Sequence, residues 1–133
     1  MPSVETVTPP NTPIPIGPYS HVARVGDFLT IGGTAGVDPA TGQLAGTDIA
    51  SQTRQILRNF EVMLQAVGSD LGHVIHVDVY LLDIADFPAM NEAYIEAFAP
   101  FGDHRPARTA IGVAALPKAG AVVTMGLTAV VAG

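Results

Sequence analysis

The chain contains no cysteine and no tryptophan among its 133 residues. Without cysteine it has no disulfide, no thiol nucleophile and no thiolate metal ligand. Basic residues are also scarce, since six Lys and Arg stand against twelve Asp and Glu, for a formal net charge of -6 at pH 7. An acidic field repels phosphate backbones and anionic membrane surfaces, so the composition predicts neither a nucleic-acid nor a membrane partner.

Long apolar runs are missing too. No stretch approaches the roughly 20 apolar residues that span a bilayer, and no basic segment followed by an apolar stretch opens the chain. We therefore expect a soluble cytoplasmic protein, formed by a single domain over residues 1–133. Hydrophobic residues make up 48% of it. That is more apolar surface than a chain this short readily buries alone, which favours self-association.

The first half of the chain predicts an extended arm, two strands and a long helix. Residues 1–15 are rich in Pro and Thr and predict an extended arm on the surface. Two short strands over 21–26 and 27–33 follow, and "VDPATGQL" has the composition of a turn. A helical period then predicts an amphipathic helix over about 48–67, with Asp48 at its start and Gly68 after its end. Its apolar stripe is Ile49, Ile56, Phe60, Met63 and Val67.

The second half predicts a strand, a helix and two more strands. The strand covers 73–82, and Asp86 is expected to cap the helix that follows. Two further strands are expected over 107–114 and 121–131. The order ββαβαββ predicts an α+β fold, a mixed sheet with two helices on one face and the other face buried by a partner. The expected buried residues are Ile75, Val77, Val79 and Leu81 in the strand and Phe87, Met90, Tyr94 and Phe98 in the helix.

Arg108 is the first candidate for a functional side chain. Strand alternation puts it on one face with Ala110 and Gly112, whose small side chains leave space above the sheet. A planar guanidinium in such a recess is suited to bidentate binding of a carboxylate. The alternative is an ordinary surface arginine paired with Asp103 or another acid.

Three other residues are weaker candidates. Thr124 lies on the more polar face of the last strand, where it could reach a ligand or a water, or could simply fill a sheet position. Tyr19 and Asn91 are each either ligand contacts or packed polar side chains. None of these residues is diagnostic by itself.

The histidines and glycines offer no cofactor or metal site. On a strand, His73 and His76 would point to opposite faces, which argues against a shared metal ion. "GGTAG", residues 32–36, lacks the lysine of a phosphate-binding loop. His21 and His104 could titrate near neutrality, but no nucleophile stands out for either to activate.

Four segments carry a family resemblance: "IGPYS", "GVDPATGQL", "DFPAMNEAY" and "RPARTAIGVAALPKAG". With them the chain resembles the reactive intermediate deaminase (Rid, or YjgF) family from about residue 14 to 131. The resemblance implies a chorismate-mutase-like fold and a homotrimer, in which the sheets form a central barrel with clefts between subunits. It also implies hydrolysis of enamines and imines such as 2-aminoacrylate to 2-oxo acids and ammonia, with neither cofactor nor metal. Matching positions give Arg108 the substrate carboxylate, and Tyr19, Gly33 and Asn91 line the cleft.

The resemblance is broken at positions that matter for chemistry. Thr124 stands where the deaminating subgroup has a glutamate thought to position or polarise water, Gly32-Gly33-Thr34 replaces Ser-Gly-Gln, and Ala110 replaces a cysteine. A threonine hydroxyl can hold a water but cannot act as a base near neutral pH. Three hypotheses therefore stay open: an enamine/imine deaminase, an enzyme for another unsaturated carboxylate such as a 2-aminomuconate-like dienamine, and a non-catalytic trimer that binds small 2-oxo acids.

We predict a homotrimer in solution, because the apolar content favours self-association and the family resemblance implies three subunits. Light scattering after size exclusion at several concentrations should give three times the chain mass. A stable monomer near 13.7 kDa would contradict both the trimer and any site built between subunits.

Overall fold

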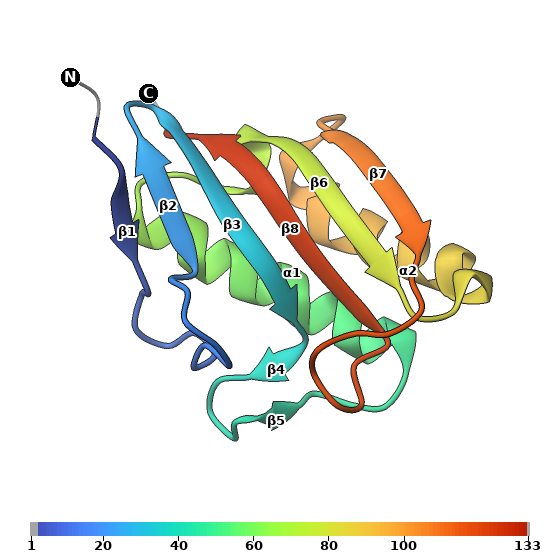
Figure 1. Ribbon diagram of the computed structural model, residues 1–133. Coiled ribbons are helices and arrows are strands. Elements are labelled where there is room, and N and C mark those ends of the chain that lie inside the picture. Colours follow the sequence, from blue (N-terminus) through green and yellow to red (C-terminus); the bar gives the residue numbers. More distant parts are fainter. Residues whose placement is uncertain (1–2, 133) are drawn as a thin grey trace.

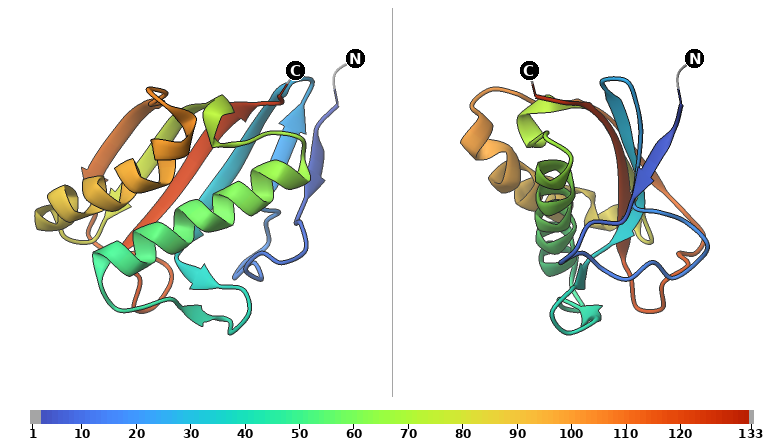
Figure 2. Two further views of the ribbon diagram at one scale, coloured as in Figure 1. Left: turned by 180° about the vertical axis from the view of Figure 1, so that it is seen from behind. Right: turned by 90° about the vertical axis from the view of Figure 1, so that its left-hand side faces the viewer.

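A computed structural model describes residues 3–132 and shows a twisted sheet backed by two helices (Figure 1). The two-layer arrangement is clear from the edge-on view, in which both helices lie on the same side of the sheet (Figure 2). In chain order the elements are β1 (Glu5–Val7), β2 (Val22–Val25), β3 (Phe28–Ala35), β4 (Val37–Asp38), β5 (Gln43–Leu44), α1 (Ile49–Ala66), η1 (Leu71–His73), β6 (Val74–Leu81), η2 (Ile84–Asp86), α2 (Phe87–Phe98), η3 (Ala99–Phe101), β7 (Ala107–Gly112) and β8 (Val123–Val130).

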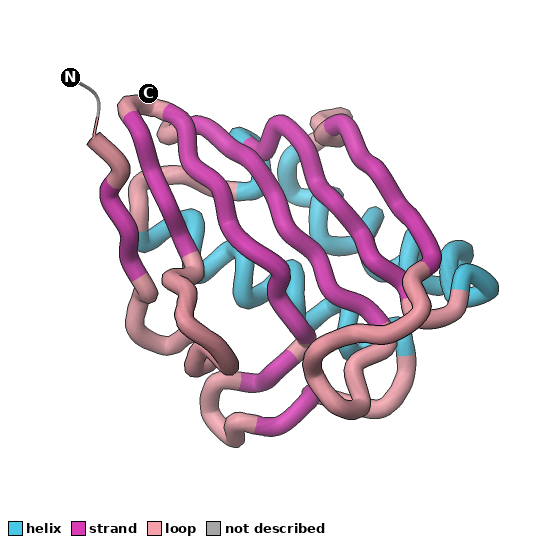
Figure 3. The backbone as a smooth tube through the Cα atoms, in the orientation of Figure 1, coloured by secondary structure: helices cyan, strands magenta, loops and turns pink. Residues whose placement is uncertain are grey.

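The main sheet has six strands in the order β1-β2-β3-β8-β6-β7 (Figure 3). β6 and β7 run parallel because α2 carries the chain back between them, and all other neighbours are antiparallel. The predicted mixed sheet with two helices on one face is confirmed. No helix in residues 3–132 is long and apolar enough to cross a membrane.

The core lies between the sheet and the helices. Side chains on the helix-facing side of β6 and β8 are almost fully buried, whereas their neighbours on the other face stay partly exposed. The predicted helical stripes pack against them, with Val67 and Phe87 at the margins. The fully enclosed members of this core are Val22, Ile56, Phe60, Met63, Leu64, Val77, Val79, Leu81, Met90, Phe98, Val123, Met125 and Ala129.

Two irregularities change which face a side chain occupies. The β6–β8 register shifts between Val74 and His76. As a result Ile75 is 43% exposed and does not share the buried face of β6, contrary to the sequence expectation. The β3–β8 register shifts between Ile31 and Thr34, so that Gly32 and Gly33 form a bulge.

Several predicted boundaries are corrected. The arm contains a strand, because Glu5–Val7 pairs with β2, and "VDPATGQL" forms the β4–β5 hairpin instead of a simple turn. Asp86 precedes α2 but its side chain makes no capping hydrogen bond, whereas Asp83 accepts from the amide of Ala85 in η2. β7 ends at Gly112, two residues before the expected end, and β8 spans Val123–Val130.

The side chain of Gln52 in α1 makes hydrogen bonds to the loops at the end of the sheet. This side chain is fully buried, and its Nε2 donates to the carbonyls of Gly46 and Gly120, each at 3.0 Å. Its Oε1 accepts from the amide of Val122 at 2.8 Å. A Cβ on Gly36 would lie 2.6 Å from the Gln52 carbonyl oxygen, so glycine is needed where β3 passes over the helix. These contacts fix the segments that surround the pocket described next.

Candidate functional site

A pocket of about 360 Å³ is formed by the N-terminal arm, the end of β3, the start of β8 and the loop before it. Apolar groups dominate its walls, and Lys118 is the single Lys or Arg among the described residues that line it. The lining residues are Pro13, Ile14, Ile16, Tyr19, Ser20, His21, Gly32, Gly33, Thr34, Ala35, Val37, Pro117, Lys118 and Thr124. Three of the predicted site residues, Tyr19, Gly33 and Thr124, are therefore brought together.

The arm positions the Tyr19 side chain by a hydrogen bond that leaves the hydroxyl proton free to donate. The amide of Ile16 donates to the Tyr19 hydroxyl oxygen at 3.1 Å, and the ring lies against Gly17, where a Cβ would be 3.4 Å from Cε2. Because the hydroxyl oxygen accepts from the backbone, its own proton is available to a group in the pocket.

Gly33 belongs to the bulge of β3 and faces open space. A Cβ placed on Gly32 or Gly33 would meet no atom within 4 Å. A bulge interrupts the ladder locally, and glycine leaves its main chain accessible to a ligand. Thr124 lies near this point, paired with Ala35 of β3 on one side and Tyr80 of β6 on the other.

Arg108 lies elsewhere, on the helix-facing side of the edge strand β7. Its guanidinium carbon is 4.8 Å from the centre of the Tyr94 ring and 5.4 Å from that of Phe87, and Nη1 is 3.9 Å from the Met90 sulfur. The space that the small side chains Ala110 and Gly112 were expected to leave is thus bordered by aromatic side chains of α2. None of the ion pairs in residues 3–132 involves Arg108, so the expected alternative, a pair with Asp103, is not formed.

The face of α2 that carries Phe87 and Tyr94 also carries Asn91, because residues three and four apart share a helix face. The Tyr94 hydroxyl and the Asn91 Oδ1 are both buried and have no hydrogen-bond partner within the described chain. Burial raises the pKa of Tyr94 to about 12, against the opposing effect of Arg108 and Arg105. At neutral pH Tyr94 is therefore an uncharged donor.

The predicted site residues form two separate groups in one chain. Arg108 pairs with Val77, whose side chain faces the helices, whereas Thr124 alternates with Val123 and Met125 and faces the open side. Two strands, β8 and β6, also separate β3 from β7, which lies at the edge of the sheet. Tyr19, Gly33 and Thr124 consequently cannot act with Arg108 and Asn91 of the same chain on one small ligand.

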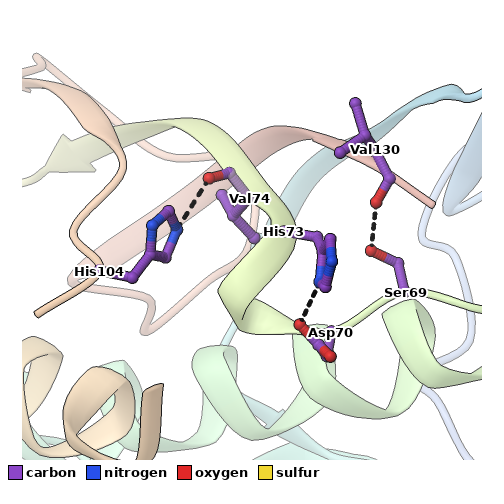
Figure 4. Close-up of polar contacts among 6 residues, drawn as sticks. All are labelled: Ser69, Asp70, His73, Val74, His104 and Val130. Atoms are coloured by element: carbon purple, nitrogen blue, oxygen red, sulfur yellow. Dashed lines mark hydrogen bonds and ion pairs between the residues drawn. The ribbon is translucent and has the colours of Figure 1, made fainter. Parts of the chain in front are cut away.

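Figure 4 shows two histidines, His73 and His104, whose side chains make hydrogen bonds within the chain. His104 Nε2 donates to the Val74 carbonyl at 3.0 Å, joining the loop before β7 to the start of β6. His73 lies in η1, not on the strand as expected, and its Nδ1 is 2.7 Å from Asp70 Oδ1. Near it, the hydroxyl of Ser69 donates to the Val130 carbonyl at 2.6 Å.

His76 points to the open face of the sheet, where its Nε2 is 3.1 Å from Asp78 Oδ1 and 3.3 Å from Thr109 Oγ1. Within residues 3–132 no three His, Cys, Asp or Glu side chains are grouped to hold a metal ion.

Sequence reasoning missed the apolar arm residues and Lys118 as parts of the pocket. Lys118 appeared only within the segment "RPARTAIGVAALPKAG", Ile14 only within the extended arm, and Ile16 only within "IGPYS". The available signal was the pair of exposed isoleucines among prolines, which have no helical or strand period to explain them. Tyr94 was correctly expected in the buried stripe, but its contact with Arg108 depends on how α2 crosses β7.

Comparison with known proteins gives consistent matches over most of the chain. The family model described as Endoribonuclease L-PSP matches residues 10–131. A RutC family protein of Pyrococcus horikoshii is 47% identical over 114 residues, covering 86% of this chain and 88% of its own. A human protein named 2-iminobutanoate/2-iminopropanoate deaminase is 42% identical over 103 residues, covering 77% of this chain and 73% of its own.

Solved structures agree. The YjgF gene product of E. coli superposes with a TM-score of 0.89 at 32% identity, covering 95% of this chain and 98% of its own. E. coli TdcF, solved with bound serine, gives 0.89 at 29% identity over 96% of this chain and 99% of its own.

The raised pKa of Tyr94 predicts a loss of stability at high pH. Between the ordinary value of 10.0 and about 12, the folded protein keeps a proton that the unfolded chain has released. The free energy of unfolding should therefore fall as pH rises through this window, by on the order of 2 kcal/mol. Urea unfolding of wild type and Tyr94→Phe from pH 9 to 12 measures it, with Tyr80→Phe as the control. An equally steep decline in Tyr94→Phe would contradict the assignment.

Proposed function

The chain belongs to the YjgF/Rid family, and from that premise we propose that it hydrolyses small enamines and imines derived from amino acids to 2-oxo acids and ammonia. The observation that carries the proposal is Arg108, a half-buried guanidinium set against two aromatic rings without a carboxylate partner among residues 3–132. Relatives named 2-iminobutanoate/2-iminopropanoate deaminase support the reaction type.

The surroundings of Arg108 favour a small carboxylate as its ligand. Stacking on Phe87 and Tyr94 orients the guanidinium plane, which reduces the rotamer freedom lost when a bidentate pair forms. The buried Asn91 Oδ1 is an acceptor without a donor, and an imine or amine N–H would satisfy it. A ligand with a carboxylate next to a C=N carbon offers both groups.

We propose that the complete site forms between two copies of the chain in a homotrimer. One copy would contribute Arg108 and Asn91, and its neighbour the pocket with Tyr19, Gly33 and Thr124. The separation of these two groups within one chain supports this assembly. Two exposed apolar side chains on the open face of the sheet also support it. Ile75 of β6 is 43% exposed and Ile111 of β7 is 46% exposed.

The reaction needs modest assistance from the protein. An enamine first gains a proton on carbon and loses one from nitrogen, which converts it into the imine. Water then adds to the imine carbon, its two protons pass to nitrogen as the C–N bond breaks, and the products are the 2-oxo acid and ammonia. Arg108 would fix the carboxylate, Thr124 would hold the water through its hydroxyl, and the free proton of Tyr19 would reach the developing oxygen or the nitrogen. Proximity supplies much of the rate of such a step.

Thr124 favours a second candidate function. Without a carboxylate at this position, carboxylate recognition is better supported than hydrolysis, and a trimer that binds small 2-oxo acids without turnover fits the same residues. An enzyme for another unsaturated carboxylate, such as a 2-aminomuconate-like dienamine, would also use Arg108. The variants below separate catalysis from binding.

We predict that Arg108→Ala weakens binding of 2-oxobutyrate by about 1.5 to 3 kcal/mol, the range for a hydrogen bond to a charged group. Arg108→Lys should restore part of it, because lysine keeps the charge but loses the planar fork. Isothermal titration measures the affinities. Arg105→Ala is the matched control, since the Arg105 guanidinium donates to backbone carbonyls of Gly102 and His104. Equal affinity in wild type and Arg108→Ala would remove the carboxylate assignment.

We predict that Thr124→Glu raises kcat for 2-iminopropanoate, by at most the 10² to 10⁴-fold of a well-placed general base. Thr124→Gln, of similar size but without a base, should show no gain. An increase in KM instead of kcat would mean that the new carboxylate pairs with a cation of the site. If wild type is already fast and Thr124→Val equally so, residue 124 does not decide the chemistry.

A further inference from the structure

The N-terminal arm is fixed to the sheet by a histidine. His21 is 4% exposed and its Nε2 donates to the Pro13 carbonyl. Its backbone amide donates to Thr8 Oγ1 at 3.3 Å, and its carbonyl accepts from the amide of Gly32 at 3.2 Å. His21 thus joins the arm on one side to the bulge of β3 on the other, and both border the pocket.

The arm segment that His21 holds presents apolar side chains to the pocket. Ile14 is 87% exposed and Ile16 59% exposed, although both are large apolar residues, in the loop between β1 and β2. With Pro13, Pro117 and Val37 they form an apolar wall. The same pocket is also lined by polar groups, the Thr124 hydroxyl and the backbone of Gly32 and Gly33.

We propose that this apolar wall receives the side chain of the substrate, so that the site prefers 2-imino acids with an isobutyl or larger apolar side chain over the methyl side chain of 2-iminopropanoate. His21 acts as a positioning residue, because its hydrogen bond to the Pro13 carbonyl holds the arm residues of this wall in place. This inference rests on the proposed function and names its substrate class.

The size of the pocket supports a larger ligand. A volume of about 360 Å³ falls within the roughly 300–1,000 Å³ of pockets that enclose drug-sized ligands. A ligand with a methyl side chain would leave most of the wall in contact with water. Each buried methylene is worth about fourfold in affinity, so the three extra carbons of an isobutyl group allow up to about sixtyfold.

The test compares two 2-oxo acids, pyruvate and 4-methyl-2-oxopentanoate, by isothermal titration of the whole protein. Wild type should bind the longer acid at least about tenfold more tightly. In His21→Ala that ratio should fall to about twofold or less, because the arm residues of the apolar wall are no longer held to the sheet. His21→Gln should recover it, because the amide N–H can donate to the Pro13 carbonyl.

Ile16→Ala tests the wall without touching the arm's hydrogen bonds, since the Ile16 amide is retained. It should reduce the ratio severalfold. Ile95→Ala is the matched control, because Ile95 is 53% exposed on α2 and does not line the pocket. Thermal unfolding of each variant identifies any loss of folding, and Ile16→Ala carries the test if His21→Ala does not fold.

Hydrolysis of the corresponding imines, generated in situ by an amino-acid oxidase, separates this inference from the proposed function. Turnover with higher kcat/KM for the leucine-derived imine supports both. Turnover with equal or better use of 2-iminopropanoate overturns the apolar preference but leaves the deaminase. No turnover, with tighter binding of the longer oxo acid, supports the preference and overturns hydrolysis. No binding of either acid overturns both.

Discussion

Side chains of β6 and β8 alternate between a face sealed by α1 and α2 and a face left open, and this alternation governs where each polar group of the site lies. Val77, Val79 and Met125 are completely buried on the sealed side. Arg108 shares that side and meets the aromatic residues of α2, whereas Thr124 falls on the open side near the pocket. A site that uses both groups needs a second copy, because a small ligand cannot reach through a sheet.

The two bulges modify this alternation at functionally informative points. At Gly32–Gly33 the extra residue lets Ile31 and Thr34 both face inward, while the glycines leave main chain open beside the pocket. At Ile75 the extra residue turns an apolar side chain outward. Each bulge thus changes the surface of the open face without disturbing the core beneath it.

Buried side chains hold the loops by hydrogen bonds to the backbone. The region around Arg108 differs, because it contains buried polar atoms that are not paired in this way. Gln52 and His21 use their side chains to secure backbone carbonyls of distant segments. By contrast, the Asn91 Oδ1 and the Tyr94 hydroxyl lie buried with no hydrogen-bond partner among residues 3–132. A buried polar group left unpaired costs free energy, and a ligand or a neighbouring subunit that pairs it recovers that cost.

The sequence by itself determined the two long helices with their buried stripes and the longer strands of the mixed sheet, because apolar spacing is a local signal. Strand parity also identified Arg108 and Thr124 as candidates, and Arg108 lies in the segment "RPARTAIGVAALPKAG" that carries the family resemblance. Only the tertiary structure decided where Ile75 points, because a bulge depends on the register of the partner strand. It likewise decided that Tyr94 lies on Arg108 and that His21 holds the arm, since both contacts join residues whose separation in the chain carries no periodic signal.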